Sequence, residues 1–195
     1  MEFPGPHSSS PNFRSQLNRR LLEARTIVVN ESLTAAVAGP ITEQLTVLAA
    51  ESDQPIQIMM SNAPGGEVEA GLSVYDLIRS LDAPVTMLGS GRITGAGVLA
   101  FVGTTADRRF ALPHAQFRLE EPADTFEAGS AADLAETARA AAEQRERIVS
   151  LLAAATGQPA DQVDADLAAQ RVFDVEAAAD YGLIRRVVQS RKDLP

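Results

Sequence analysis

The chain has 195 residues, of which 45% are hydrophobic, enough for one compact domain with a full core. It has no cysteine, which excludes a disulfide framework, a thiolate zinc site and a cysteine nucleophile. Its formal net charge of −9 argues against nucleic acid and anionic membranes as partners, because both require clustered positive charge.

The first half of the chain predicts a short arm followed by alternating helices and strands. Residues 1–12 are rich in Pro, Ser and Gly and predict a flexible arm without the apolar core of a signal peptide, so we expect a cytoplasmic protein. The apolar patterns then predict a helix over 13–24, a strand over 25–30, a helix over 41–52, a strand over 55–62, a helix over 67–81, a strand over 83–88 and a small-residue helix over 94–103. This alternation is typical of an α/β domain with parallel strands.

The second half contains two short strands, over 108–113 and 115–120, then a polar stretch and a long helix over 131–155. Two short helices and a closing strand complete the chain. One stripe of the long helix is mostly alanine and offers too little apolar side-chain surface to form a core within one subunit. We therefore expect it to contact another subunit. The stripe consists of Leu134, Ala138, Ala141, Arg145, Ile148 and Leu152.

Two glycines, Gly65 and Gly66, follow a predicted buried strand and open a helix in SNAPGGEVEAG. Backbone N–H groups at such a turn can point toward an oxyanion or an extended peptide, unhindered by a Cβ. Taken alone, however, this segment favours an ordinary turn between a strand and a helix.

The segment GSGRITGAG, residues 89–97, has the pattern of an elbow that displays a nucleophile at the end of a strand. Its glycine spacing misses the dinucleotide fingerprint by one residue, so we expect no nucleotide site. The residue at the top of the elbow is Thr94, whose hydroxyl could attack only if a base removed its proton.

Candidate bases are few. The chain has two histidines, His7 in the arm and His114, and a lone histidine after a proline is more typical of a surface or capping residue. Glu120 and Glu121 are adjacent in a predicted strand and would point to opposite faces, so they do not form an acid and base pair. We expect them to be solvated or salt-bridged.

Residues 61–122, together with TGQPADQV and AAADYGLIRRVV, resemble the proteolytic subunit of the ATP-dependent Clp protease, ClpP. The resemblance runs from about Phe13 to Val188 and combines APGG, AG-x-x-x-YD, ALP and YGLI at matching spacings. It implies an α/β fold, a ClpP/crotonase-like superhelix of β-β-α repeats with a protruding strand-helix handle at about 121–155. The domain would span 13–188, followed by a tail over 189–195.

The resemblance also implies a role. ClpP subunits form seven-membered rings, two rings meet through their handles, and a Ser-His-Asp triad cleaves peptides inside the chamber. The expected partners are therefore further copies of this chain, an active ClpP paralogue and a Clp family ATPase, with no metal and no cofactor.

Residue by residue, the serine, histidine and aspartate of the triad fall on Thr94, Glu120 and Gln170. All three are replaced. His114 lies six residues before Glu120, roughly 20 Å along a continuous strand, so it cannot supply the base. A solvated carboxylate with an ordinary pKa of about 4.3 is a poor base for an alcohol.

Other positions of the family pattern are carried over in the same way. The oxyanion and peptide-binding positions are Gly65, Gly66 and Gly95. The positions that would dock the unfoldase are Ile58, Met60, Phe110 and Leu112. The arginine that the family uses in contacts between rings falls on Ala169.

Three functions remain open from the sequence. The first is an inactive, structural and regulatory ClpP-like subunit that assembles with an active paralogue. The second is a weakly active peptidase that uses Thr94. The third is an independent peptide-binding ring. A crotonase-type acyl-CoA enzyme would share the fold, but the handle signature makes it the weakest alternative.

Overall fold

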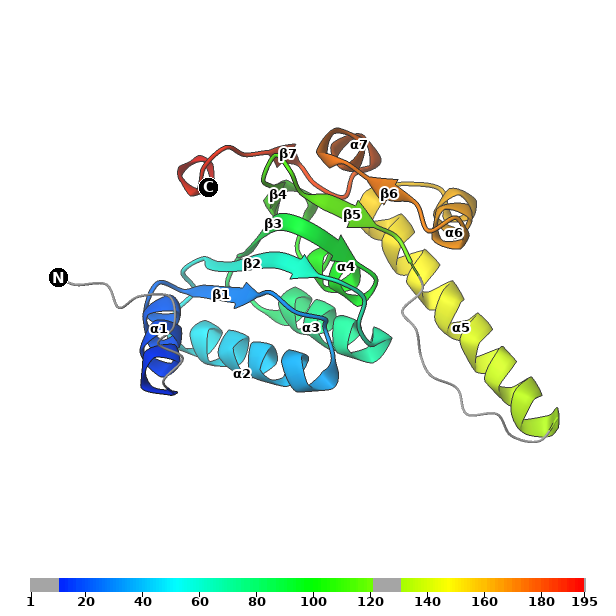
Figure 1. Cartoon of the computed structure of the whole chain (residues 1–195), viewed down its shortest axis with the longest axis horizontal. Coiled ribbons are helices and arrows are strands. Elements are labelled where there is room, and N and C mark those ends of the chain that lie inside the picture. The colour runs from blue at the N-terminus through cyan, green and yellow to red at the C-terminus, as the bar shows by residue number, and fades with distance from the viewer. Residues whose placement is uncertain (1–10, 121–130, 195) are drawn as a thin grey trace.

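The computed structural model describes residues 11–120 and 131–194 (Figure 1). The chain begins with α1 (Pro11–Glu23), β1 (Thr26–Val29), α2 (Ala35–Glu51), β2 (Ile56–Ala63), α3 (Val68–Ser80), β3 (Val85–Thr94), α4 (Ala96–Phe101), β4 (Arg109–Ala111) and β5 (Gln116–Arg118). It continues with α5 (Ala131–Thr156), α6 (Ala160–Ala168), β6 (Val172–Phe173), α7 (Val175–Tyr181) and β7 (Arg186–Val187). Single 3₁₀ turns precede β4 and follow β7. The predicted α/β class is therefore confirmed.

The described strands form one sheet in the order β1-β2-β3-β4-β7, and all of these neighbours are parallel. β3 is long enough to pair with two strands in succession, with β4 along its first half and with β5 along its second half. β6 then pairs with β5 in the antiparallel sense. The end of β3 consequently lies between β2 and β5, and this position defines the candidate site.

β3 differs from the prediction, which ended this strand at Leu88 and began the next helix at Thr94. The strand continues through Gly89 and Gly91 to Thr94, and α4 begins only at Ala96. A Cβ on Gly89 would lie 3.0 Å from the rim of the Phe117 ring, so a bare backbone lets the strand pass this aromatic side chain. At Gly91 (φ +63°) the register with β2 shifts by one residue, which marks a β-bulge.

The helix after β1 also begins earlier than predicted, at Ala35 rather than Ile41. Pro40 lies inside α2, although proline removes one backbone hydrogen bond and crowds the preceding turn. The buried side chains of the helix lie on both sides of this proline: Ala38, Ile41, Leu45 and Leu48. Tertiary packing of this apolar face therefore outweighs the local cost of the proline.

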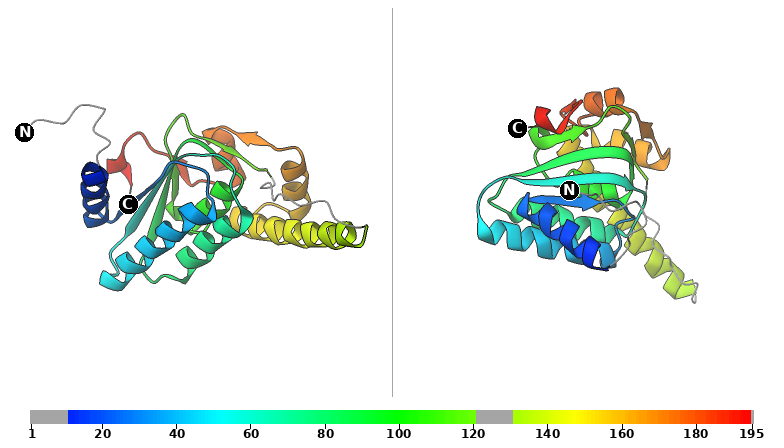
Figure 2. Two further views of the ribbon diagram at one scale, coloured as in Figure 1. Left: turned by 60° about the horizontal axis from the view of Figure 1, so that its bottom comes forward. Right: turned by 60° about the vertical axis from the view of Figure 1, so that its left-hand side comes forward.

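α2, α3 and α4 cover one face of the sheet and enclose the main core (Figures 1 and 2). α3 and α4 approach closely, because a Cβ on Gly71 would lie 2.7 Å from the Ala96 carbonyl oxygen. A separate, smaller cluster consists of Leu88, Phe110 and Val188, with Leu112 and Leu194 packed against it. The residues predicted as a tail thus include Leu194, which packs on this cluster.

α5 projects from the body of the molecule (Figures 1 and 2). The prediction that its whole alanine-rich stripe contacts another subunit is wrong for the C-terminal part, because Ile148 and Leu152 are 2% and 1% exposed in this chain's own core. Arg145 forms a 2.7 Å ion pair with Asp164 of α6. Ala138, nearer the projecting end, is exposed. The predicted strand of the handle and Glu121 lie outside the described residues.

Candidate functional site

The candidate site lies where β3 ends and the chain turns into α4. Thr94 is the last residue of β3 and is 3% exposed. Gly95 makes the turn with φ +51° and ψ −121°, a backbone conformation that favours glycine. A Cβ at Gly95 would lie 3.4 Å from both the Glu120 side chain and Gly65 Cα. Two separate segments of the chain are therefore packed directly against this elbow.

The Thr94 hydroxyl is hydrogen-bonded on both sides. The Gly65 N–H donates to Thr94 Oγ1 at 2.6 Å. The hydroxyl in turn donates to Glu120 Oε1 in a short contact. The proton that a nucleophile would have to lose is thus directed at a carboxylate, and one lone pair of the same oxygen is already engaged.

Glu120 follows β5 and faces Arg118, two residues earlier on the same side of the strand. Arg118 Nε lies 3.3 Å from Glu120 Oε2, and the two side chains are 36% and 18% exposed. That distance defines an ion pair, but Nε is not aligned for a hydrogen bond with any described acceptor. The sequence predicts that Glu120 is solvated or salt-bridged, and the structure shows the salt-bridged alternative.

Gln170 occupies the turn between α6 and β6 and has a positive φ of 50°. Its side-chain oxygen accepts a hydrogen bond from Arg118 Nη2. The structure therefore brings Thr94, Glu120 and Gln170 into one polar network, in which Arg118 joins the last two. Sequence reasoning missed Arg118, although its spacing of two from Glu120 in a strand was a usable signal.

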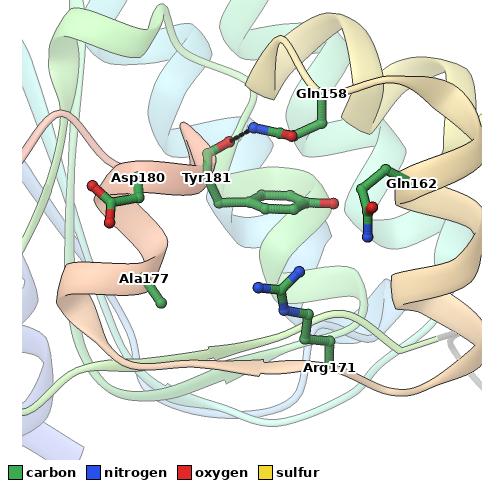
Figure 3. A pocket seen from close by; sticks show the side chains of 6 residues that line it. All are labelled: Gln158, Gln162, Arg171, Ala177, Asp180 and Tyr181. Carbon is green, nitrogen blue, oxygen red and sulfur yellow. Dashed lines mark hydrogen bonds between the residues drawn. The ribbon is translucent and has the colours of Figure 1, made fainter.

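Arg171, the residue after Gln170, lines a polar cleft of about 340 Å³ together with Tyr181 and residues of α6 and α7 (Figure 3). Arg171 Nη1 lies 3.1 Å from the buried carboxylate of Asp166, and its guanidinium lies 4.7 Å from the centre of the Phe173 ring. Burial raises the pKa of Tyr181, and Asp166 contributes to the shift. Because the Tyr181 hydroxyl has no hydrogen-bond partner among the described atoms, we attribute the contribution of Asp166 to its charge. The contacts of Arg171 with Asp166 and Phe173 thus help to hold the turn that carries Gln170.

The three glycines predicted as oxyanion donors lie around the elbow, but two of their amides are used within the chain. Gly65 N–H is bonded to Thr94, and Gly95 N–H donates to the Arg118 carbonyl at 3.4 Å. Gly66, with φ +115°, pairs with Leu33, and a Cβ there would lie 2.4 Å from the Leu33 carbonyl oxygen. The turn at 65–66 therefore has a structural reason to contain glycine.

His114 is exposed in the connection between β4 and β5, not in one continuous strand with Glu120. It borders a cleft of about 330 Å³ together with Asn62, Arg92 and Gln116. Thr94 and Glu120 do not line this cleft. The structure thus does not bring His114 to the elbow.

The structure contradicts most of the predicted docking surface. Ile58 and Met60 are each 1% exposed and belong to the main core, because alternate residues of β2 point toward the helices. Phe110 is also 1% exposed, in the smaller cluster, and only Leu112 is half-buried. The opposite face of β2 presents Met59, which pairs with Leu88 of β3.

Within the described ranges, no group of three or more His, Asp or Glu side chains could hold a metal ion. In the same part of the chain, no helix combines the length and apolar character needed to cross a membrane.

Comparison with known proteins identifies relatives over almost the whole chain. The family model described as Clp protease matches residues 10–191. An ATP-dependent Clp protease proteolytic subunit 3 of Rhizobium johnstonii is 38% identical over 174 residues, which cover 89% of each chain. A proteolytic subunit 2 of Pseudomonas aeruginosa is 31% identical and covers 92% of this chain and 89% of its own.

Solved structures agree with these similarities to Clp protease subunits. ClpP1 from Listeria monocytogenes superposes with a TM-score of 0.81 at 29% identity, covering 92% of this chain and 99% of its own. The structure of a mutant of the same Listeria protein gives the same TM-score over 90% of this chain and 98% of its own. The predicted ClpP-like α/β fold is therefore confirmed.

Proposed function

Because the chain belongs to the Clp protease family, we propose that it is a non-catalytic subunit that assembles with an active proteolytic subunit in a Clp-type ring. Members of this family form oligomeric rings that work with Clp ATPases. In this proposal the chain supplies wall and contact surfaces to a mixed ring, and its partner supplies the peptide-cleaving serine. An ATPase of the Clp family would act on the assembled ring.

The observation that carries the proposal is the environment of the Thr94 hydroxyl. In a Ser-His-Asp site an imidazole accepts the proton of the nucleophile and later donates it to the leaving amine. Here the acceptor is the Glu120 carboxylate, whose second oxygen faces the positive charge of Arg118. The proton acceptor at this position is therefore a carboxylate in an ion pair and not the imidazole that a Ser-His-Asp site uses.

The low exposure of the Thr94 hydroxyl also supports an inactive site. Thr94 is 3% exposed, and its oxygen already accepts the Gly65 N–H. An attacking oxygen would have to use its one remaining lone pair and reach a carbonyl carbon at about 3 Å from this buried position. Among the described residues no imidazole lies at the elbow, because His114 borders a different cleft and His7 lies outside the described ranges.

The projecting half of α5 supports the assembly part of the proposal. Exposed alanine side chains such as Ala138 leave room for another helix to approach closely. The C-terminal half of the same helix is anchored by Ile148 and Leu152, which keeps the projecting half in a fixed direction. A rigid, exposed helix of this kind suits a contact between subunits.

The test is hydrolysis of a short fluorogenic peptide by the purified chain and by its Thr94→Ala variant, with the assembly state recorded by native mass spectrometry. We expect no rate above background in assembled material and no difference between the two proteins. Thr104→Ala is the matched control, because Thr104 is also buried and hydrogen-bonded but lies away from the elbow. Mixing with an active proteolytic subunit from the same organism should yield mixed rings.

One observation favours a second function, a weak peptidase that uses Thr94 as nucleophile and Glu120 as base. The direct hydrogen bond between the two side chains is the geometry that base-assisted attack requires. On that hypothesis the peptide would be cleaved slowly by the chain alone, and both Thr94→Ala and Glu120→Gln would abolish the rate. A rate with this behaviour would replace the proposal of a non-catalytic subunit.

A further inference from the structure

We propose that Arg118 is a positioning residue that binds the side chains at 120 and 170 together and prevents an acidic residue at 170 from orienting a base at 120. This inference rests on the proposed function, since it concerns a site whose catalytic positions are replaced. It adds a fourth residue to the three substitutions that account for the loss of the triad.

The backbone places Arg118 at the centre of the network. On one side it pairs in register with Thr94 of β3, and on the other with Val172 of β6. Its side chain extends between Glu120 and Gln170, with Nε 3.3 Å from Glu120 Oε2 and Nη2 bonded to Gln170 Oε1. One guanidinium therefore occupies the space between the two positions where a histidine and an aspartate would have to meet.

The guanidinium also has donor capacity left. Arg118 Nε is buried and is not aligned with any described hydrogen-bond acceptor. A hydrogen bond between a charged donor and a charged acceptor is roughly twice as strong as one between neutral groups. An aspartate at 170 would thus pair with Arg118 more strongly than the neutral Gln170 does.

The consequence for a restored triad follows from the role of the aspartate. The aspartate holds the imidazole in the tautomer that accepts the serine proton, and in a serine protease its loss lowers kcat by about 10⁴. If Arg118 captures the carboxylate at 170, a histidine at 120 lacks this orientation. Replacing the three triad positions alone should then leave the site almost inactive.

Removal of Arg118 should not undo the turn that carries Gln170. Three backbone hydrogen bonds hold this segment independently: Gln170 N–H to the Leu167 carbonyl at 3.0 Å, Arg171 N–H to the Asp166 carbonyl at 2.9 Å, and Leu119 N–H to the Arg171 carbonyl at 3.0 Å. The Arg118 side chain can therefore be replaced while positions 120 and 170 keep their backbone placement.

The test compares two variants of the full chain in the fluorogenic peptide assay, again with native mass spectrometry. The triple variant is T94S/E120H/Q170D, and the quadruple variant adds R118M. We expect the quadruple variant to be at least 100-fold faster than the triple variant, which stays near background. The matched control adds R92M instead, which changes an exposed arginine of the adjacent strand and should give no gain.

Equal rates in the triple and quadruple variants, or a quadruple variant no faster than background, would overturn the role of Arg118. The unmodified chain tests the proposed function separately, because a rate lost in Thr94→Ala refutes that function whatever the variants do. A second measurement tests the proposal even if the triple and quadruple variants fold poorly. In the otherwise unmodified chain, R118M and E120Q should shift the urea midpoint non-additively, whereas additive shifts would count against the proposal.

Discussion

Replacing Thr94 by valine keeps the shape of the side chain and removes its hydroxyl. Two hydrogen bonds are lost, the one donated to Glu120 and the one accepted from Gly65 N–H. Serine at the same position keeps the hydroxyl and removes only a methyl group. The pair of variants therefore separates the polar role of the site from its packing.

The expected magnitude follows from the two lost bonds. A hydrogen bond to a charged group contributes about 1.5 to 3 kcal/mol, and a buried N–H left without an acceptor costs about 1 to 3 kcal/mol. Because Thr94 is 3% exposed, water replaces these partners poorly. We expect Thr94→Val to lower the free energy of unfolding by about 3 kcal/mol, or Tm by about 6 to 12 °C for a domain of this size. Thr94→Ser should cost about 1 kcal/mol.

Both variants should be measured by urea and thermal unfolding followed by circular dichroism. Protein concentration must be held fixed, because assembly raises the apparent stability of the folded chain. A Thr94→Val protein as stable as Thr94→Ser would refute the reasoning, since it would mean that the hydroxyl contributes nothing to the folded state.

Two further predictions concern the body of the domain and α5. Arg109 is 3% exposed, its pKa is lowered to about 10 by burial, and it donates to three backbone carbonyls in the core, so Arg109→Met should lower unfolding stability by about 3 kcal/mol. The exposed Arg185→Met should change stability by under about 0.5 kcal/mol in the same urea titration, and equal losses would contradict this assignment. Ala138→Glu, on the projecting half of α5, should shift native mass spectra toward single rings or free subunits without altering the circular dichroism spectrum. Ala154→Glu, exposed near the body end of the helix, should assemble normally, and identical spectra for the two variants would exclude this part of α5 as a contact.

The sequence determined the order of the helices and strands and the three positions that match the triad. Period-two runs such as IQIMM, period-four stripes and the glycines after each strand are local signals, and they were sufficient for the α/β class. The motifs around positions 94, 120 and 170 are sufficient to align these positions with the triad. The spacing of two between Ile58 and Met60 in a strand also indicates that both side chains share one face, which in the structure is the buried face.

The tertiary structure decided what surrounds those positions. Whether Glu120 is solvated or bonded to Thr94 depends on the register of β5 against β3, and the bulge at Gly91 shifts the register of β3 by a residue. The link from Glu120 to Gln170 depends on Arg118, which lies 52 residues before Gln170 in the chain. Local periodicity fixes which face a side chain takes, but only the pairing of distant strands fixes which side chains share that face.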